Sequence, residues 1–342
     1  MNSSEAGLTV AVVGATGLVG RMMLQVLEER NFPVKRLLPV ASDRSVAEGA
    51  SVRFRGELLH VTGVEATVEE KPDLALFSAG GSVSLEWAPR FAAVGTTVVD
   101  NSSAWRMHPD HKLVVPEVNG DVLEAGDLVI ANPNCTTAQL VMALKPLHNR
   151  WGVRRGVVST YQSVTGSGKP GIQQLNDERQ GILDGPAAYP HPIDRNCIPH
   201  CDQFDLNTGY TKEEMKVWHE TKKILGDDEV AITCTAVRVP VEGGHSESVF
   251  VELSSEPESL DAVREVLAAF PGVVVVDDPE DLAYPMPLAA HGHDQVFVGR
   301  IRRDLVNPAA LHLWVVADNL RKGAATNAVQ IAEHLLATGR WA

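Results

Sequence analysis

The segment Leu8-Thr-Val-Ala-Val-Val13 leads directly into Gly14-Ala-Thr-Gly-Leu-Val-Gly20. The first run is apolar and β-branched and predicts a buried strand, while the glycines predict a tight turn into a helix that begins near Leu18. Glycines at such a turn let a pyrophosphate approach the backbone, and the helix N-terminus offers free N–H groups. The segment therefore predicts a dinucleotide site. Its spacing is G-x-x-G-x-x-G rather than G-x-G-x-x-G, so a tight turn without a ligand is the alternative.

The alternation of strand and helix continues through the first third of the chain and predicts a parallel, doubly wound sheet of the Rossmann type. From about Arg154 the apolar runs become longer and alternate with polar residues. This change predicts an α+β domain with a large mixed, mostly antiparallel sheet and helices on one face. The expected strands are residues 8–13, 37–41, 74–78, 96–99 and 128–131, and then 156–164, 230–241, 248–254, 295–302 and 311–316.

The length of 342 residues predicts two domains. We expect a dinucleotide-binding domain over 1–133, completed by a C-terminal segment, 320–342, whose helix at 322–338 packs back on it. The catalytic, substrate-binding and dimerisation domain is then 134–319. A stretch rich in Pro, His and Asn, 185–200, predicts a long loop within it.

The composition excludes several classes of function. A net charge of −14 argues against nucleic acid or an anionic membrane as partner, since both need clustered Lys and Arg. No apolar run approaches the roughly 20 residues of a membrane span, and the first residues lack a secretory pattern, so we expect a cytoplasmic protein. Four cysteines are too few for a disulfide framework in a chain of this size.

One cysteine lies at a position that favours ionisation of its thiol. The run Ile130-Ala-Asn-Pro-Asn-Cys-Thr-Thr137 leads from a strand into a helix expected at 138–147. Asn134 or Cys135 therefore lies at a helix N-terminus, where the positive end of the helix dipole favours a thiolate. An isolated cysteine is more often inert, so the assignment of a nucleophile depends on its neighbours.

The strand Val237-Arg-Val-Pro-Val241 leads into a glycine-rich bend, Glu242-Gly-Gly-His245. A guanidinium at Arg238 could clamp a carboxylate bidentately, and an imidazole at His245 could move protons to and from a cysteine or a carbonyl oxygen. Taken alone, the histidine fits a hydrogen-bonded loop position better.

A capping box of Thr211 with Glu214, and a glycine stop, predict a helix over 211–226. The helix places Glu220 and Lys223 three residues apart on one face. Two charges of opposite sign could bind a substrate that carries both an amine and an anion, although a surface ion pair is the commoner meaning of such spacing.

Two further segments of the first domain carry cations near expected strand ends. The segment 101–107 contains Arg106, a candidate anion ligand or a surface arginine. In 41–45, Arg44 and two serines would accept the 2′-phosphate of NADP, whereas Asp43 would suit the 2′-hydroxyl of NAD. We favour NADP.

The whole set resembles the aspartate-β-semialdehyde dehydrogenases from Val10 to about Ala332. The resemblance rests on the helix pair Glu220 and Lys223 and on six segments in order. These are GATGLVG (14–20), NSSAWRM (101–107), NPNCTT (132–137), YQSVTGSG (161–168), RVPVEGGHSE (238–247) and WVVADNLRKGAATNAVQIAE (314–333).

The resemblance implies a role for each matching residue. Cys135 is the nucleophile, Gln162 orients the intermediate and His245 is the acid/base. Arg238 binds the substrate carboxylate, Glu220 its amino group, and Arg106, Asn134 and Lys223 the phosphate. The implied cofactor-binding residues are Gly14, Ala15, Thr16, Gly17, Leu18, Val19, Ser42, Arg44, Ser45, Ser78, Ala79, Gly80, Ser163, Gly166 and Asn319.

The resemblance also implies the reaction. It is the reversible, NADP-dependent reductive dephosphorylation of L-β-aspartyl phosphate to L-aspartate β-semialdehyde through a cysteine thioester. Inorganic phosphate is the co-substrate of the reverse direction, and no metal is needed. The implied pathways are the biosynthesis of lysine, diaminopimelate, threonine and methionine. The implied assembly is a homodimer or a tetramer, with no nucleic acid or membrane partner.

Two departures and two alternatives accompany this interpretation. Asp43 stands where a small neutral residue is expected, and Glu242 adds a negative charge beside the bend that carries His245. One alternative is a reductase of the N-acetylglutamyl-phosphate type, which uses the same cysteine and histidine but a substrate with a blocked amine. The other is a catalytically silent dinucleotide-binding relative.

Three motifs are set aside. The run 164–169 resembles a P-loop ending, but Pro170 follows its lysine where a P-loop has a hydroxyl. Cys197 and Cys201 lack a second pair of ligands for zinc. A short cluster at 291–294 has no partner motif.

Overall fold

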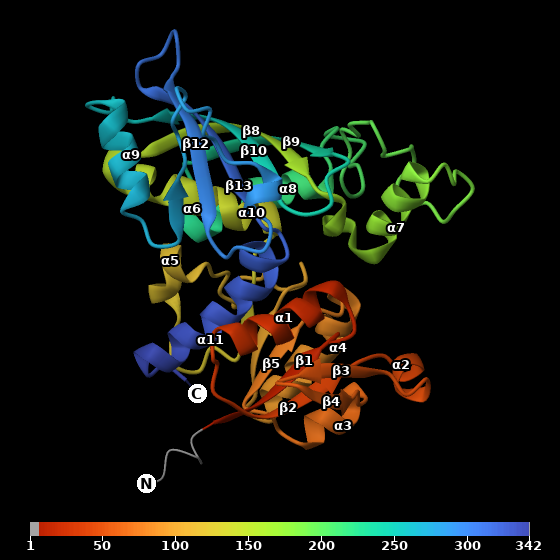
Figure 1. The fold of residues 1–342 in the computed structure, drawn as a ribbon. Coiled ribbons are helices and arrows are strands. Elements are labelled where there is room, and N and C mark those ends of the chain that lie inside the picture. The colour runs from red at the N-terminus through yellow and green to blue at the C-terminus, as the bar shows by residue number, and fades with distance from the viewer. Residues whose placement is uncertain (1–6, 342) are drawn as a thin grey trace. The chain divides into compact units, whose positions relative to one another are not determined.

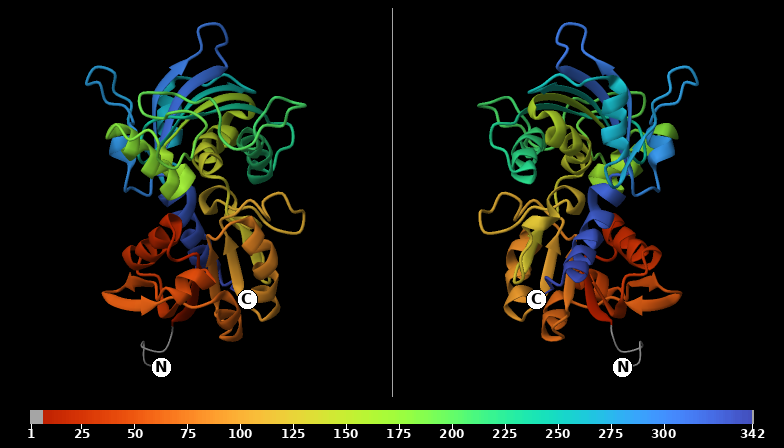
Figure 2. Two further views of the ribbon diagram at one scale, coloured as in Figure 1. Left: turned by 90° about the vertical axis from the view of Figure 1, so that its right-hand side faces the viewer. Right: turned by 90° about the vertical axis from the view of Figure 1, so that its left-hand side faces the viewer.

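The computed structural model describes residues 7–341. The chain divides into two compact units, one formed by 1–133 with 324–342 and the other by 134–323. Figure 1 labels the elements of both units, and Figure 2 shows them from two further sides. Among the described residues, no helix is both long and apolar enough to span a bilayer.

The first unit contains a five-stranded sheet in the order β2-β1-β5-β6-β7, and every neighbouring pair is parallel. The predicted Rossmann-type arrangement is therefore confirmed. The strand order reverses between β1 and β5, and ligands of such sheets bind at the carboxyl ends beside this reversal. The strands are β1 (Leu8–Val13), β2 (Val34–Val40), β5 (Leu74–Phe77), β6 (Thr97–Asp100) and β7 (Val129–Ala131).

Both faces of this sheet are buried, which explains why its strands are apolar without alternation. Along β1, Val10 and Val12 belong to one core cluster, and Ala11 and Val13 belong to another. The long helices of this unit are α1 (Leu18–Glu29), α4 (Gly81–Ala93) and α11 (Thr326–Thr338). The short ones are α2 (Asp43–Ala47), α3 (Val64–Glu69), α5 (Pro116–Asn119) and η1 (Gly120–Val122).

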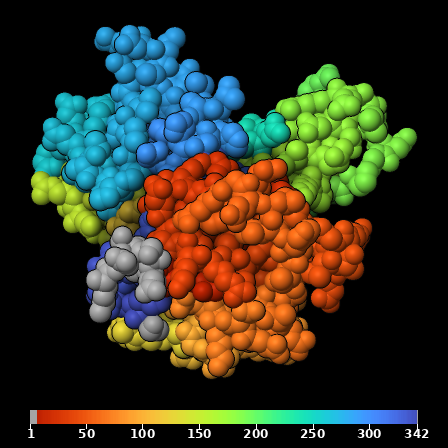
Figure 3. Space-filling model, turned by 60° about the horizontal axis from the view of Figure 1, so that its bottom comes forward, coloured from red at the N-terminus to blue at the C-terminus, as the bar shows by residue number. Residues whose placement is uncertain are grey.

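Two parts of the first unit differ from the sequence expectation. A hairpin of β3 (Ser51–Phe54) and β4 (Glu57–His60) was not predicted, because each strand has only four residues, two of them polar. The C-terminal helix begins at Thr326 rather than at 322, because Arg321–Ala325 form a π-helical turn. Helix α11 then packs against α1, α5, β5 and β6. Figure 3 shows the surface of this unit in red to orange.

The second unit contains a six-stranded sheet in the order β11-β12-β13-β10-β8-β9. The three inner pairs are antiparallel, and the outer pairs β11·β12 and β8·β9 are parallel, so the sheet is mixed as expected. Its strands are β8 (Val153–Gln162), β9 (Ala231–Arg238), β10 (His245–Leu253), β11 (Val273–Val275), β12 (Val296–Arg303) and β13 (Ala310–Ala317).

Helix α6 (Cys135–Trp151) packs along this sheet against β8, β10, β12 and β13, and α8 (Lys212–Leu225) packs against β9. The capping box that begins α8 is present, and Gly226 ends the helix in the left-handed conformation. The remaining helices are α7 (Gly168–Arg179), α9 (Leu260–Ala268), α10 (Pro287–Ala290) and η2 (Val164–Ser167). None of these four was predicted.

The sheet of the second unit buries one carboxyl with little polar support. Glu247 on β10 is fully buried, and neither carboxylate oxygen has a well-formed hydrogen bond among the described residues, although the Gln139 side chain opposes part of the effect of burial. Burial raises the pKa of this carboxyl well above its ordinary value. Glu247 therefore destabilises the fold at any pH where the unfolded chain ionises it, which is above about pH 4.3.

We predict that Glu247→Gln raises the unfolding temperature most at pH 8, and that the gain shrinks as the pH falls toward 4.5. When the unfolded chain carries an ionised Glu247, folding requires this carboxyl to take up a proton, which costs free energy. Glutamine carries no charge, so the variant avoids that cost. Thermal unfolding of both proteins across this pH range measures the difference. Glu252→Gln, a partly exposed carboxyl on the same strand, is the control. A gain that is equal at all pH values would contradict the argument.

Candidate active site

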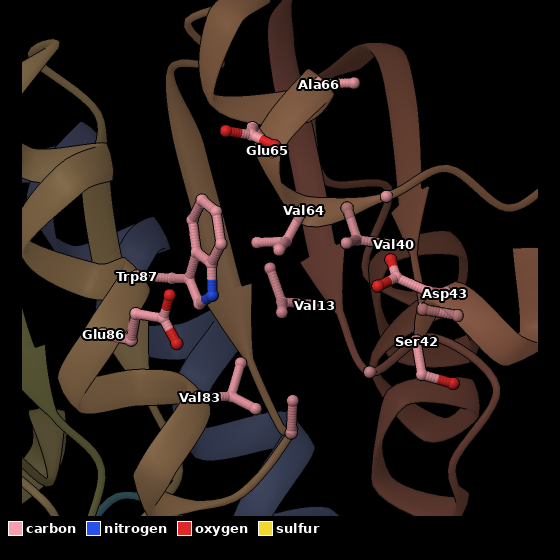
Figure 4. A pocket seen from close by; sticks show the side chains of 14 residues that line it. Val13, Val40, Ser42, Asp43, Val64, Glu65, Ala66, Val83, Glu86 and Trp87 are labelled. Carbon is pink, nitrogen blue, oxygen red and sulfur yellow. The ribbon is translucent and has the colours of Figure 1, made fainter.

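The first unit has a cavity of about 670 Å³ beside the carboxyl ends of β1 and β2, within the usual range for a small-molecule site. Figure 4 shows the labelled side chains of its wall. The lining residues come from the glycine turn, from the 40–43 segment, and from α3 and α4. They are Val13, Gly14, Val40, Ala41, Ser42, Asp43, Gly63, Val64, Glu65, Ala66, Ala79, Val83, Glu86 and Trp87.

The turn between β1 and α1 fits a dinucleotide phosphate. Gly14 has a φ of +92°, and a Cβ there would collide with the backbone of Ser78. A Cβ on Gly20 would collide with the backbone of Gly14, so the helix approaches the turn closely only because position 20 is glycine. Helix α1 has Gly17 as its N-cap with no side-chain cap among the described residues. Its first N–H groups can therefore meet an anion.

The charged residues that line this cavity are acidic: Asp43, Glu65 and Glu86. The Ser42 hydroxyl accepts a hydrogen bond from the Ser45 N–H and so caps α2. Asp43 lines the cavity, whereas Arg44 does not and pairs with Glu48 at 2.8 Å on the exposed surface. Of the predicted cofactor residues, Gly14, Ser42 and Ala79 line the cavity.

The helix that carries the cysteine begins as the sequence predicts. Asn134 is the N-cap of α6, and its side-chain oxygen accepts hydrogen bonds from the N–H groups of Thr136 and Thr137. Its backbone N–H donates to Glu220 Oε2 at 2.7 Å. Cys135 is the first residue of the helix and is partly exposed. A Cβ added to Gly323 would collide with the Cys135 Cβ. Glycine at this position therefore allows the π-helical turn to pack against Cys135.

His245 is buried among groups that fix its tautomer. Its Nδ1 accepts a hydrogen bond from the Ser163 backbone N–H at 3.0 Å, so a neutral ring carries its proton on Nε2. The Ser163 hydroxyl lies 3.0 Å from both His245 Nδ1 and Asn319 Oδ1. Burial and the nearby Arg238 charge lower the pKa of His245 to about 3, so the imidazole is neutral at physiological pH.

Arg238 lies beside this histidine. Its Nη1 donates to the Ser163 carbonyl oxygen at 2.7 Å, and its guanidinium lies 5.7 Å from the centre of the Tyr189 ring. A Cβ added to Gly166 would meet both the Arg238 guanidinium and the His245 ring. Position 166 is therefore glycine where two functional side chains converge.

Three buried polar atoms of this cluster lack a hydrogen-bond partner among residues 7–341: Gln162 Oε1, Arg238 Nε and His245 Nε2. Gln162 and Arg238 are direct register partners on β8 and β9, and His245 begins β10 on the other side of β8. Buried polar atoms are nearly always paired, so a concentration of orphans marks a place where a polar ligand binds.

The structure brings together most of the predicted site residues of the second unit, and we call Asn134, Cys135, Gln162, Glu220, Arg238 and His245 the catalytic cluster. Ser163, Gly166 and Asn319, which the sequence assigned to the cofactor, contact this cluster. Lys223 lies one turn after Glu220 on α8. Arg106 belongs to the first unit, where its Nε donates to the Asn132 carbonyl oxygen at 2.9 Å.

Sequence reasoning missed two residues of this region. Glu213 on α8 accepts hydrogen bonds from the side-chain amides of both Asn134 and Gln162. Tyr189, in the predicted loop, stacks under Arg238. The only sequence signal for Glu213 was its place in the first turn of a capped helix, which ordinarily indicates a helix-dipole contact.

Comparison with known proteins agrees with both units. The model of the semialdehyde dehydrogenase NAD-binding domain matches residues 9–125, and that of the semialdehyde dehydrogenase dimerisation domain matches 144–322. The chain is 52% identical to the aspartate-semialdehyde dehydrogenase of Aquifex aeolicus, over 97% of this chain and 99% of the relative. It is also 46% identical to that of Bacillus subtilis, over 96% and 97%.

Solved structures agree as well. Aspartate semialdehyde dehydrogenase II of Vibrio cholerae, solved in complex with ASA, superposes with a TM-score of 0.91 at 44% identity, covering 97% of this chain and 99% of that one. The Candida albicans aspartate semialdehyde dehydrogenase solved with NADP has a TM-score of 0.78 at 25% identity, covering 98% and 100%. Two domain models, high identity over nearly the whole length and a common fold agree, and this chain belongs to the aspartate-semialdehyde dehydrogenase family.

Proposed function

We propose that this enzyme reduces L-β-aspartyl phosphate to L-aspartate β-semialdehyde and phosphate, reversibly, with NADPH and through a thioester on Cys135. The observation that carries the proposal is the catalytic cluster. In it a cysteine begins a helix in the same unit as three buried polar atoms that have no hydrogen-bond partner among the described residues. The family assignment favours this substrate over an N-acetylglutamyl phosphate and argues against a silent relative.

The first half of the reaction needs a nucleophile and a place for the departing phosphate. A thiolate at the N-terminus of α6 attacks the acyl carbon, the S–C bond forms, and the C–O bond to phosphate breaks. Asn134 Oδ1 is engaged in capping and one Nδ2 hydrogen is given to Glu213, so one amide hydrogen remains for phosphate. Lys223 and Arg106 supply the cationic partners that this leaving group requires.

The second half reduces the thioester. Gly14, Gly17 and the N-terminus of α1 would hold a dinucleotide pyrophosphate, and when bound the nicotinamide supplies hydride to the thioester carbon. A neutral imidazole is too weak an acid for this step, so His245 must first take up a second proton, the one that Cys135 loses on becoming a thiolate. The protonated ring then gives a proton from Nε2, the ring atom that has no hydrogen-bond partner among the described residues, as the C–S bond breaks, the thiol is released and the ring returns to its neutral form.

The substrate recognised must carry a carboxylate and an amine. Arg238 keeps its Nε unpaired within the part of the chain that is described and is buried, which suits a carboxylate ligand. Glu220 is buried and offers carboxylate oxygens, which suit an ammonium group. An enzyme of this kind serves the synthesis of lysine, threonine and methionine.

The matched dimerisation domain supports a homodimer formed through the second unit. The face of its sheet turned away from α6 carries exposed apolar residues such as Val157, which is 38% exposed. An apolar sheet face of this kind favours burial against a second copy.

We predict that Cys135→Ala lowers phosphate-dependent NADP reduction with aspartate semialdehyde by at least ~10³-fold, because no other group can form the thioester. The parent enzyme is assayed beside it. Alkylation of the parent by iodoacetamide should label Cys135 before Cys201 or Cys234, because burial raises the pKa of Cys201 to about 11 and raises that of Cys234 as well. Equal turnover in parent and variant would refute the mechanism.

We predict that a carboxylate ligand raises the pKa of His245. In the free enzyme the ring should stay neutral, with its proton on Nε2, from pH 5.5 to 8, because burial and Arg238 hold its pKa near 3. An aspartate analogue that pairs with Arg238 cancels part of the opposing charge, so the titration midpoint moves upward. ¹⁵N NMR of histidine-labelled enzyme, with His245→Gln for assignment, measures both states. A free-enzyme midpoint near 6.5 would contradict this assignment.

We predict that Asp43→Ala lowers the KM for NADP by about 3- to 10-fold, with little change for NAD. The carboxylate of Asp43 lines the cavity and repels a 2′-phosphate, and Arg44 can leave its exposed pair with Glu48 at little cost. Steady-state kinetics with both cofactors measure the ratio. Glu65→Ala, another acid of the same wall, is the comparison. A lower KM for NAD alone would count against NADP as the natural cofactor.

A further inference from the structure

A buried carboxylate contacts two side chains of the catalytic cluster but forms and breaks no bond in the proposed reaction. Glu213, in the first turn of α8, is 8% exposed. Its Oε1 accepts hydrogen bonds from Asn134 Nδ2 and from Gln162 Nε2, each at 2.9 Å. Its Oε2 accepts from Lys216 Nζ at 3.0 Å, and Lys216 is itself held by Asp202 at 2.8 Å.

The two amides are thereby oriented by one atom. An ionised carboxylate only accepts hydrogen bonds, so each amide must turn its NH₂ group toward Glu213 and its oxygen away. For Asn134, the oxygen that is turned away caps α6 at the residue before Cys135. For Gln162, it is the buried Oε1 that has no partner among the described residues.

The surroundings of Glu213 favour its ionised form. Burial opposes ionisation, but the Lys216 charge and the hydrogen bonds from Gln162, Asn134 and Lys216 outweigh it and lower the pKa of Glu213 to about 2. Protonation would place an O–H donor against groups that already donate, the two amides at Oε1 or Lys216 Nζ at Oε2, so the full set of hydrogen bonds depends on the ionised form. At any pH of assay the carboxylate therefore acts as a fixed acceptor.

We propose that Glu213 is a positioning residue of this enzyme: it holds Gln162 with its oxygen presented to the substrate and Asn134 as the cap that begins α6 at Cys135. The inference rests on the proposed function, because Gln162 and Cys135 act in that reaction. It deepens that function by naming the group that orients both. The competing explanation is that Glu213 and Lys216 form a buried ion pair that only stabilises α8.

The test is a double-mutant cycle with kcat and KM measured separately. Glu213→Ala should lower kcat about 10- to 100-fold and change the KM for aspartate semialdehyde less, since misplacing a catalytic group by about 1 Å costs up to 10²-fold. In a Gln162→Ala background the same replacement should cost clearly less than it does in the parent, because one of the two amides that Glu213 orients is gone and only the effect through Asn134 remains. Glu213→Gln, which keeps one acceptor oxygen, should give a kcat between those of the parent and Glu213→Ala.

Glu214→Ala is the matched control. This neighbouring carboxylate is equally buried, but its hydrogen bonds within residues 7–341 come from the backbone N–H groups of Thr211 and Ala236, at 2.7 and 2.9 Å. Its loss should lower the unfolding temperature and leave kcat within about 2-fold of the parent. If Glu213→Ala does not fold, the cycle is run with Glu213→Gln.

Two results would overturn the inference. One is a double variant whose loss of kcat equals the product of the two single losses. The other is a Glu213 variant whose kcat is no lower than that of Glu214→Ala at equal loss of stability. A parent without Cys135-dependent turnover would overturn the proposed function and this inference with it. A parent with such turnover but with independent effects of Glu213 and Gln162 would overturn the inference alone.

Discussion

The start of helix α6 at Asn134 is the constraint on which the catalytic cluster depends. A helix must satisfy its first N–H groups, and here the Asn134 side-chain oxygen accepts two of them. The backbone N–H and the amide of the same residue are then held by Glu220 and Glu213. The side-chain oxygen, the backbone N–H and one amide hydrogen of the cap thus have defined partners, which fixes the point at which the helix begins at Cys135.

The surrounding interior keeps some polar atoms unpaired. A buried donor or acceptor without a partner costs about 1–3 kcal/mol, so a fold with Gln162 Oε1, Arg238 Nε and His245 Nε2 all unsatisfied among its described residues is less stable than one with apolar groups there. The packing of α6 and α8 against the six-stranded sheet offsets that loss. The result is a rigid scaffold with oriented polar atoms, which favours a ligand that can pair with all three.

Local signals were predicted well and distant ones were not. The β1 turn and the α8 capping box were found because the residues that form them lie within a few positions of one another. The hairpin β3–β4 and helix α7 have no comparable local sequence signal and were missed. Glu213 could not be found, since its partners Gln162 and Asn134 are 51 and 79 residues away, and no spacing rule connects an acid to two amides across the fold.

The charges in the catalytic cluster also impose an order on the chemistry. Burial and Arg238 keep His245 neutral in the free enzyme, so the protonated ring that could give a proton is scarcely populated until the arginine charge is offset. In the proposed mechanism a substrate carboxylate on Arg238 would supply that offset, and its arrival would raise the proton affinity of the ring at the time when a proton donor is needed. A ligand that lacks the carboxylate would meet a cysteine without an effective acid. Recognition of the substrate and readiness for proton transfer therefore depend on the same guanidinium.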